Sequence, residues 1–194
     1  IPDGLRLRLC GGEALPRDLA TILATGPDGT TAWNVYGPTE TTVWSAAGRV
    51  EVGADGQAAP VLVGPPLPGT RWYVLDDHLA PVRDGVVGDV WIAGAGVARG
   101  YLARPAQTAD AFRPDREHAG ERMYRTGDVG VLLPDGRIAL HGRADHQVKI
   151  RGYRIELEEI EVALRRVPGI ADAVVSAVVG PTGDPADRHL VAFI

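Results

Sequence analysis

The sequence predicts an α+β fold that is rich in strands, and three patterns support this prediction. Residues 61–104 contain short apolar and aromatic runs separated by turn residues, as is typical of a barrel-like β subdomain. Two further apolar runs flank Pro134-Asp135-Gly136, the pattern of a β-hairpin with its glycine in the left-handed conformation. Residues 156–167 place apolar side chains at helical spacing, so an amphipathic helix is expected there.

The composition indicates a folded domain and excludes several classes of protein. The 194 residues are 45% hydrophobic and 23% charged, values close to those of globular domains. The net charge of −5, without a basic block, is unsuited to nucleic-acid binding. Apolar runs stay below the roughly 18 residues of a membrane span and no signal peptide is visible, so a cytoplasmic protein without a membrane partner is expected. The single cysteine, Cys10, excludes an internal disulfide and a cysteine-cluster metal site.

The first part of the chain predicts two strands with a helix between them. Residues 5–10 alternate apolar and polar side chains, the pattern of a half-buried strand that ends at Gly11-Gly12. Its core face is expected to carry Leu5, Leu7 and Leu9, and its other face Arg6, Arg8 and Cys10. Pro16 suits the first position of a helix that ends near Gly26, and a second strand is expected at 33–36.

The rest of the chain predicts mainly strands, with two more helices. Thr108 is expected to cap a short helix that runs to Phe112. Acidic residues fill the first half of the 156–167 helix and Arg165-Arg166 its end, which complements the helix dipole. Strands are expected at 71–75, 90–93, 129–133, 137–140, 172–179 and 189–194.

Residues 34–42 contain the densest group of side chains that could take part in chemistry. A strand ends there at a tight Gly37-Pro38 turn, and the hydroxyl of Thr39 then stands next to the carboxylate of Glu40. Threonine hydroxyls donate to phosphate oxygens, and a neighbouring carboxylate can hold Mg²⁺. Tyr36 offers a ring on which a nucleobase could stack. The residues alone fit equally well a capped turn in an ordinary loop.

Three other segments have both a functional and a purely structural interpretation. Asp128 follows Gly127 at a strand end, where it could accept ribose hydroxyls or simply form an Asx turn. Residues 94–100 lack the spacing of a phosphate-binding glycine loop and are interpreted as a close-packed turn. The charged segment 142–152 could be a solvated hairpin or a polar hinge. The five histidines show no metal-ligand spacing; they are His78, His118, His141, His146 and His189.

Five segments follow one another in an order and at spacings that point to one family. They are residues 9–15, 34–42, 94–102, 124–128 and 142–157. Together they resemble the adenylation domain of nonribosomal peptide synthetases over almost the whole chain. The fuller text of 34–42 and 147–156 favours this branch over the acyl- and aryl-CoA synthetases and luciferases of the same superfamily.

The resemblance implies a reaction in two steps. An amino-acid carboxylate attacks the α-phosphate of ATP, which gives aminoacyl-AMP and pyrophosphate, and the acyl group then passes to the phosphopantetheine thiol of a peptidyl carrier domain. Two alternatives stay open: an acyl- or aryl-CoA ligase that uses free coenzyme A, and a non-catalytic nucleotide-binding or interaction module. The family also allows a small MbtH-like helper protein as a partner.

The resemblance also assigns roles to individual residues. Nucleotide binding is implied for Gly11, Gly12, Glu13, Asn34, Tyr36, Gly37, Thr39, Asp128 and Arg143. Within this set Tyr36 is expected to stack on adenine, Thr39 to contact the α-phosphate, and Asp128, assisted by Arg143, to bind the ribose. Catalysis is implied for Thr39, for Glu40 as the Mg²⁺ ligand, and for Lys149 in the thioester-forming conformation.

The amino-acid side chain is expected to be bound by positions that flank these motifs. They are Arg8, Cys10, Val35, Val43 and Trp44. The bulk of Trp44 favours a small substrate, and Arg8 would either pair with an acidic side chain or point to solvent. Leu140 departs from the family, which usually has an aromatic residue there.

The family's organisation divides the chain into two lobes. Residues 1–144 correspond to the later part of the large lobe, and residues 145–194 to the start of the smaller mobile lobe, with Asp145 as the hinge. The family's phosphate-binding loop and its catalytic lysine are expected outside this sequence, which begins at Ile1 rather than at a methionine. The chain is therefore expected to act with the rest of its polypeptide and to be inactive alone.

Overall fold

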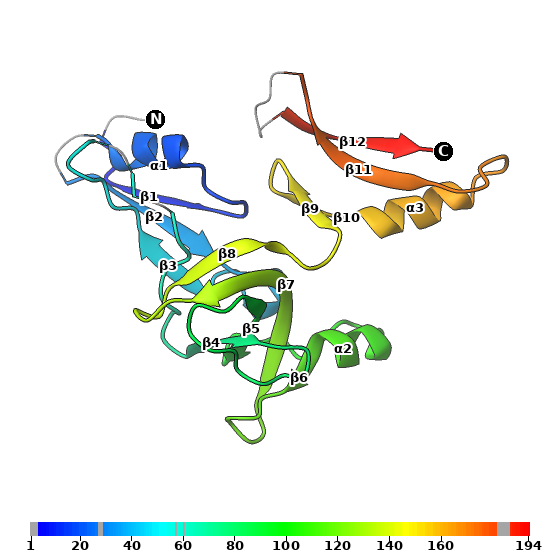
Figure 1. The fold of residues 1–194 in the computed structure, drawn as a ribbon, viewed down its shortest axis with the longest axis horizontal. Coiled ribbons are helices and arrows are strands. Elements are labelled where there is room, and N and C mark those ends of the chain that lie inside the picture. The colour runs from blue at the N-terminus through cyan, green and yellow to red at the C-terminus, as the bar shows by residue number, and fades with distance from the viewer. Residues whose placement is uncertain (1–3, 27–28, 57, 60, 182–186) are drawn as a thin grey trace. The chain divides into compact units, whose positions relative to one another are not determined.

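The chain divides into two compact units, residues 1–144 and residues 145–194 (Figure 1). The computed structural model describes residues 4–26, 29–56, 58–59, 61–181 and 187–194. The four tryptophans of the sequence all belong to the first unit, whereas its single lysine, Lys149, belongs to the second. Strands predominate in both units, and the predicted α+β class is confirmed.

The smaller sheet of the first unit contains β1 (Leu7–Gly11), β2 (Thr31–Tyr36) and β3 (Ala46–Arg49), in that order. β1 and β2 run parallel and are connected through α1 (Arg17–Ala24), whereas β3 returns antiparallel to β2. Parallel strands end at the same edge of a sheet, the edge at which open α/β sheets bind ligands. The predicted nucleotide segments after β1 and after β2 therefore lie next to each other.

The two faces of β1 are the reverse of those predicted. Leu5, Leu7 and Leu9 are exposed by 45%, 55% and 47%, whereas Arg8 is buried and Cys10 packs against the core beneath α1. The alternation was correct, but the assignment of faces was wrong. It failed because α1 covers the Arg8 side of the strand. There the guanidinium donates to carbonyl groups at the end of the helix, 2.7 Å from Leu23 O and 2.9 Å from Thr25 O.

The larger sheet of the first unit has five strands, each antiparallel to its neighbours. They are β4 (Thr70–Leu75), β5 (Gly88–Gly94), β6 (Phe112–Pro114), β7 (Arg122–Leu132) and β8 (Ile138–Arg143). The order is β4-β5-β7-β6, with β8 also paired to β7, so the long β7 has three partners. Within the described residues the sheet stays open and does not close into a barrel.

Alternating side chains give this sheet two different faces. On one face Trp72, Val90 and Ile92 form a core with Ile138, and Tyr36 packs against it. On the other face Trp91 forms a second core with Leu75, Ala93 and Met123. The end of β2 is thereby tied to the first face, which is where the candidate site lies.

One short helix begins earlier than predicted. α2 spans Pro105–Ala111 and follows Arg104 as its N-cap, so the prediction that Thr108 caps this helix was wrong. Proline is favoured in the first turn of a helix because its missing N–H needs no partner there. The Thr108 hydroxyl instead accepts the backbone N–H of Tyr101 at 2.9 Å.

The predicted hairpin around Pro134 is confirmed. β7 and β8 pair from Leu132–Ile138 onwards, and the amide of Leu133 donates to the carbonyl of Arg137 at 2.9 Å. Gly136 has φ +81°, the left-handed conformation expected from the sequence.

The second unit contains β9 (Gln147–Ile150), β10 (Tyr153–Glu156), α3 (Leu157–Arg165), β11 (Val174–Val179) and β12 (Arg188–Phe193). β9 pairs with β10 and β11 with β12, both antiparallel. The predicted helix over 156–167 is confirmed with slightly narrower bounds. In the part of the chain that the structure describes, no helix is long and apolar enough to cross a membrane.

Candidate active site

The ends of β1 and β2 approach each other so closely that the chain needs glycine there. A Cβ added to Gly11 would lie 2.2 Å from the carbonyl oxygen of Val35, and Gly12 has φ +98°. Both observations are typical of backbone that only glycine accommodates without strain. The predicted Gly11-Gly12-Glu13 turn is therefore held against the end of β2, one residue before Tyr36.

The backbone of the turn after β2 is strained. Thr39–Thr41 form a short 3-10 helix, after which Thr42 and Val43 have φ values of 63° and 67°. Positive φ is unusual for β-branched residues and costs on the order of 1–3 kcal/mol each. Such strain persists only where the surroundings enforce it, and it is concentrated at functional sites.

Contacts with neighbouring segments hold this strained backbone in place. A Cβ on Gly37 would come within 2.5 Å of the Val43 carbonyl oxygen, so the turn closes tightly on itself. The Thr42 hydroxyl donates to the carbonyl of Gly96 at 2.7 Å, and the amide of Ala98 donates to the carbonyl of Glu40 at 2.8 Å. Residues 94–98 thus pack on the 3-10 helix as a close turn, which agrees with the interpretation made from the sequence.

Tyr36, Asp128 and Arg143 meet, although they come from three different strands. The Tyr36 hydroxyl, at the end of β2, donates to one carboxylate oxygen of Asp128 on β7, across 92 residues of sequence. Arg143 at the end of β8 approaches the other carboxylate oxygen at 3.0 Å and also donates to the carbonyl of Thr126 at 3.1 Å. The three side chains form one polar cluster with Asp128 at its centre.

Burial keeps the Tyr36 hydroxyl in its neutral, donating form. Burial is the largest cause that raises the pKa of Tyr36 well above its usual value, and the negative charge of Asp128 raises it further. Arg143 opposes this shift to a smaller extent. The Tyr36 ring also packs against Trp72, with centroids 5.5 Å apart. The orientation of the ring is therefore fixed at both its edge and its face.

Glu40 is a buried carboxylate in the 3-10 helix, exposed by only 7%. One of its oxygens accepts a hydrogen bond from the Tyr101 hydroxyl at 2.7 Å. Among the described residues, no group of three or more His, Cys, Asp and Glu side chains could hold a metal ion by itself. Mg²⁺ is commonly bound through one or two carboxylates together with substrate phosphates, so a single carboxylate beside threonine hydroxyls fits this ion.

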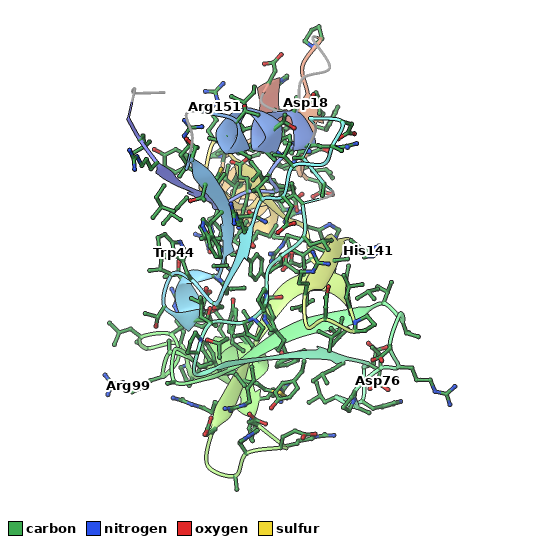
Figure 2. The ribbon with its side chains drawn as sticks, turned by 90° about the vertical axis from the view of Figure 1, so that its left-hand side faces the viewer. Asp18, Trp44, Asp76, Arg99, His141 and Arg151 are labelled. Atoms are coloured by element: carbon green, nitrogen blue, oxygen red, sulfur yellow. The ribbon has the colours of Figure 1, made fainter. Side chains whose placement is uncertain are left out.

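The five predicted pocket residues lie on two sides of the small sheet. Arg8 and Cys10 face α1, whereas Val35 lies on the opposite face, where its Cγ2 is 2.7 Å from the position of a Cβ on Gly11. Val43 and Trp44 follow the 3-10 helix and are exposed by 63% and 46%. Figure 2 labels the Trp44 side chain. Because Arg8 is buried and donates to carbonyls at the end of α1, the alternative that it points to solvent is wrong, and its pairing with an acidic side chain stays a prediction.

The predicted residues of the second unit lie on and before one hairpin. The carboxylate of Asp145 accepts the amide of Gln147 at 3.2 Å, which closes a turn before β9. Lys149 is partly buried on β9 and pairs across the ladder with Arg154. Arg151 and Gly152, with φ of 52° and 80°, form the tight turn that joins β9 to β10.

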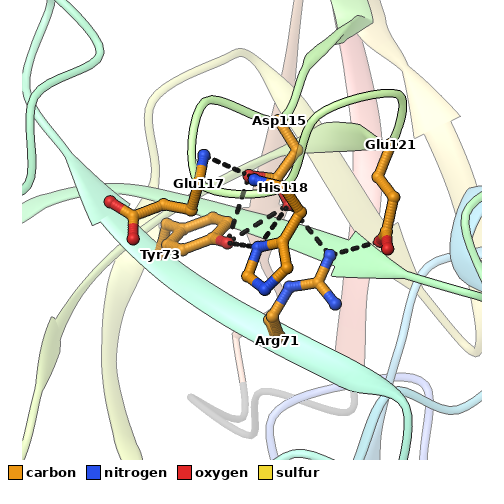
Figure 3. A network of polar contacts seen from close by, with 6 residues as sticks. All are labelled: Arg71, Tyr73, Asp115, Glu117, His118 and Glu121. Atoms are coloured by element: carbon orange, nitrogen blue, oxygen red, sulfur yellow. Dashed lines mark hydrogen bonds and ion pairs between the residues drawn. The ribbon is translucent and has the colours of Figure 1, made fainter.

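Sequence reasoning missed two groups of polar residues. One is Tyr101, for which the only signal was its place in the 94–102 segment. The other is a network on the far face of the large sheet, around the buried carboxylate of Asp115 (Figure 3). Arg71 donates to Asp115 at 2.9 Å, and the Tyr73 hydroxyl lies 3.2 Å from both carboxylate oxygens. No local pattern indicates these contacts, because the partners are more than 40 residues apart.

Comparisons with known proteins agree on one family. Residues 2–102 match the family model described as AMP-binding enzyme. A linear gramicidin synthase of Brevibacillus parabrevis is 47% identical over 197 residues, which covers 100% of this chain and 4% of that protein. A plipastatin synthase of Bacillus subtilis (strain 168) is 53% identical over 132 residues, covering 68% of this chain and 5% of that protein. The chain thus spans only a small part of these relatives.

Solved structures of adenylation domains are similar to this chain in fold. PA1221, a nonribosomal peptide synthetase protein containing adenylation and PCP domains, aligns with a TM-score of 0.82 and 30% identity over 98% of this chain and 38% of its own. The Vibrio cholerae adenylation domain AlmE in complex with glycyl-adenosine-5'-phosphate aligns with a TM-score of 0.78 and 30% identity over 98% of this chain and 36% of its own.

Proposed function

The chain belongs to the AMP-binding enzymes and corresponds to part of a nonribosomal peptide synthetase adenylation domain, and from this premise we propose that it serves amino-acid activation. The proposed reaction joins an amino-acid carboxylate to the α-phosphate of ATP with release of pyrophosphate. The aminoacyl group then passes to the phosphopantetheine thiol of a peptidyl carrier domain. The structural relatives that contain both adenylation and PCP domains support a carrier domain as partner.

The meeting of Tyr36, Asp128 and Arg143 is the observation that carries this proposal. Arg143 lies 3.0 Å from one oxygen of Asp128, and each carboxylate oxygen has two lone pairs, so both oxygens can still accept a ribose hydroxyl. The ring of Tyr36, fixed by Asp128 and Trp72, would offer its face to adenine. One relative of known structure is bound to AMP and glycine, which supports a nucleotide here.

The turn after β2 would serve the phosphates. Thr39 is exposed at the start of the 3-10 helix, where its hydroxyl could donate to the α-phosphate. Glu40 would hold Mg²⁺ together with the phosphates, and the ion would neutralise phosphate charge. Gly11, Gly12 and Glu13 would border the same pocket from the end of β1.

The substrate side chain would be bound beside this turn. Val43 and Trp44 are the exposed members of the proposed pocket, with Val35 at its base. Cys10 and Arg8 lie on the face of β1 that packs against α1. Arg8 would therefore support the pocket by fixing the end of α1 rather than by touching substrate.

The second half-reaction is proposed to depend on the second unit. In this proposal residues 1–144 are the later part of the large lobe, residues 145–194 begin the mobile lobe, and Asp145 is the hinge. Domain rotation about a hinge is a known form of conformational step, and here it would let one site serve both reactions. Lys149, the only lysine of the sequence, is assigned to thioester formation. No second lysine is then left for the role of the family's catalytic lysine in adenylation. The 194 residues alone are therefore expected to form little aminoacyl-AMP.

The experiment separates the two half-reactions in the polypeptide that contains this chain. Amino-acid-dependent ATP–pyrophosphate exchange measures activation, and transfer of radiolabelled amino acid to the carrier domain measures thioester formation. We expect Lys149→Ala to preserve exchange and to slow transfer by about 100-fold, as misplacement of reacting groups can. Arg154→Ala, which changes the cross-strand neighbour of Lys149, is the matched control and should leave both rates nearly unchanged.

Two results would contradict the proposal. Absence of exchange with every proteinogenic amino acid would argue against amino-acid activation itself. An equal loss of exchange and transfer in Lys149→Ala would argue against the role given to Lys149 while leaving activation intact.

A further inference from the structure

Tyr101 contacts Glu40 from a part of the chain that no assigned role includes. Its hydroxyl donates to a carboxylate oxygen of Glu40 at 2.7 Å, across 61 residues of sequence. Glu40 is buried, and a buried carboxylate is costly unless hydrogen bonds stabilise its charge. The contact therefore bears directly on the stability and the orientation of the proposed Mg²⁺ ligand.

Tyr101 is itself held in place, its ring by packing against Phe112 and its backbone by a hydrogen bond. Phe112 meets it edge to face with centroids 5.4 Å apart, and Tyr124 packs against Phe112 at 5.0 Å. The Tyr101 amide donates to the Thr108 hydroxyl at 2.9 Å. A Cβ on Gly100 would come within 2.3 Å of Thr108 Cγ2, so this segment packs directly on α2. These contacts fix the position of the Tyr101 hydroxyl.

The segment that carries Tyr101 also fixes the backbone on which Glu40 stands. The amide of Ala98 donates to the Glu40 carbonyl at 2.8 Å, and the Thr42 hydroxyl donates to the Gly96 carbonyl at 2.7 Å. Residues 96–101 therefore hold Glu40 at both its main chain and its carboxylate. Partners that orient a metal ligand in this way typically affect metal affinity by about 10- to 100-fold.

We propose that Tyr101 is a positioning residue that holds the Glu40 carboxylate aimed for a divalent cation bound with the nucleotide phosphates. The inference rests on the proposed function, since it concerns the cation that ATP would bring. It adds to that function a residue on another segment and a directional prediction about metal affinity.

The test compares two variants that each remove one tyrosine hydroxyl from a buried carboxylate. Tyr101→Phe keeps the ring against Phe112 and loses the hydroxyl that donates to Glu40. Tyr73→Phe loses the hydroxyl next to Asp115 on the opposite face of the large sheet, and so controls for a general loss of stability. Binding of Mn²⁺ in the presence of α,β-methylene-ATP, followed by electron paramagnetic resonance, measures metal affinity without turnover.

We expect Tyr101→Phe to weaken Mn²⁺ binding by about 10-fold, and Tyr73→Phe to change it by less than about twofold. Glu40→Gln removes the charge that Tyr101 would position. If Tyr101 acts through Glu40, adding Tyr101→Phe to Glu40→Gln should weaken binding no further. Equal Mn²⁺ affinity in Tyr101→Phe and the wild type would overturn the inference, as would additive losses in the double variant.

The design separates this inference from the proposed function. All variants are made in the polypeptide that contains this chain. If its wild type binds no Mn²⁺ with the nucleotide and shows no ATP–pyrophosphate exchange, the proposed function itself fails. If the wild type does both and Tyr101→Phe matches it, only the positioning role fails.

Discussion

Replacing the buried carboxylate of Asp115 by an amide should destabilise the first unit by about 2 kcal/mol. The side chain is fully shielded from solvent and accepts the amide of Glu117 at 2.9 Å through one oxygen and Arg71 at 2.9 Å through the other. In Asp115→Asn the carbonyl oxygen can keep the loop amide, but the new NH₂ group then faces the Arg71 donor. A lost hydrogen bond to a charged group costs about 1.5–3 kcal/mol, and Arg71 keeps Glu121 as a partner, which favours the lower half of that range.

The effect should depend on pH in a defined direction. Burial opposes ionisation of Asp115, but hydrogen bonds from Arg71 and the Glu117 amide outweigh it and hold the pKa of Asp115 below its usual value of 3.8. A carboxyl whose pKa is lower in the folded state stabilises the fold above its unfolded pKa, and this contribution is lost as the pH falls through the folded pKa. The difference between wild type and Asp115→Asn should therefore be full at pH 7 and shrink below about pH 3.8.

Urea unfolding followed by tryptophan fluorescence measures this difference. All four tryptophans lie in the first unit, so the transition reports on that unit. Asp110→Asn is the matched control, because Asp110 is 83% exposed and its 3.6 Å ion pair with Arg113 should contribute less than about 0.5 kcal/mol. An Asp115→Asn variant as stable as the control at pH 7, or a difference that does not shrink in acid, would refute the reasoning.

Two further substitutions test features of the small sheet. Arg8→Met keeps the apolar stem but removes the donors to the last carbonyls of α1, so it should cost about 2 kcal/mol and speed amide exchange in that helix; unchanged exchange would contradict the capping role. Val43→Gly should stabilise the first unit by about 1 kcal/mol and so raise its urea midpoint, because Val43 has positive φ and is 63% exposed; a lower midpoint would show that the valine side chain stabilises the turn.

Elements whose information is local could be predicted from the sequence. The residues Pro134-Asp135-Gly136 by themselves favour a tight turn, and the structure confirms both the hairpin and the left-handed Gly136. α3 follows from its apolar spacing and from the acidic and basic residues at its two ends. Each of these signals lies within about a dozen residues and depends little on what packs against it.

Features that depend on packing could not be predicted. The alternation in β1 is correct, but only the docking of α1 decides that Arg8 faces inward and Leu7 outward. α2 begins at Pro105 with Arg104 as its N-cap, so Thr108 lies inside the helix instead of capping it.

In the candidate site, too, the sequence predicted individual segments but not the contacts between them. Resemblance identified the segments, and the geometry brings Tyr36 and Asp128 together across 92 residues. The bond between Tyr101 and Glu40 spans 61 residues and has no signature in either segment alone. Tyr36 and Asp128 lie on strands of different sheets, and Tyr101 and Glu40 lie outside the strands, so local patterns do not encode these contacts.

The distribution of tryptophan and lysine has a practical consequence for following the two units. The tryptophans are energy donors in the first unit, and Lys149 is the one side-chain amine of the sequence, on β9 of the second. With the α-amino group of the chain blocked, an amine-reactive acceptor dye on Lys149 would make the chain a donor–acceptor pair without any engineered cysteine. The efficiency of energy transfer, recorded as nucleotide is added, would then follow rearrangements of the two units in solution.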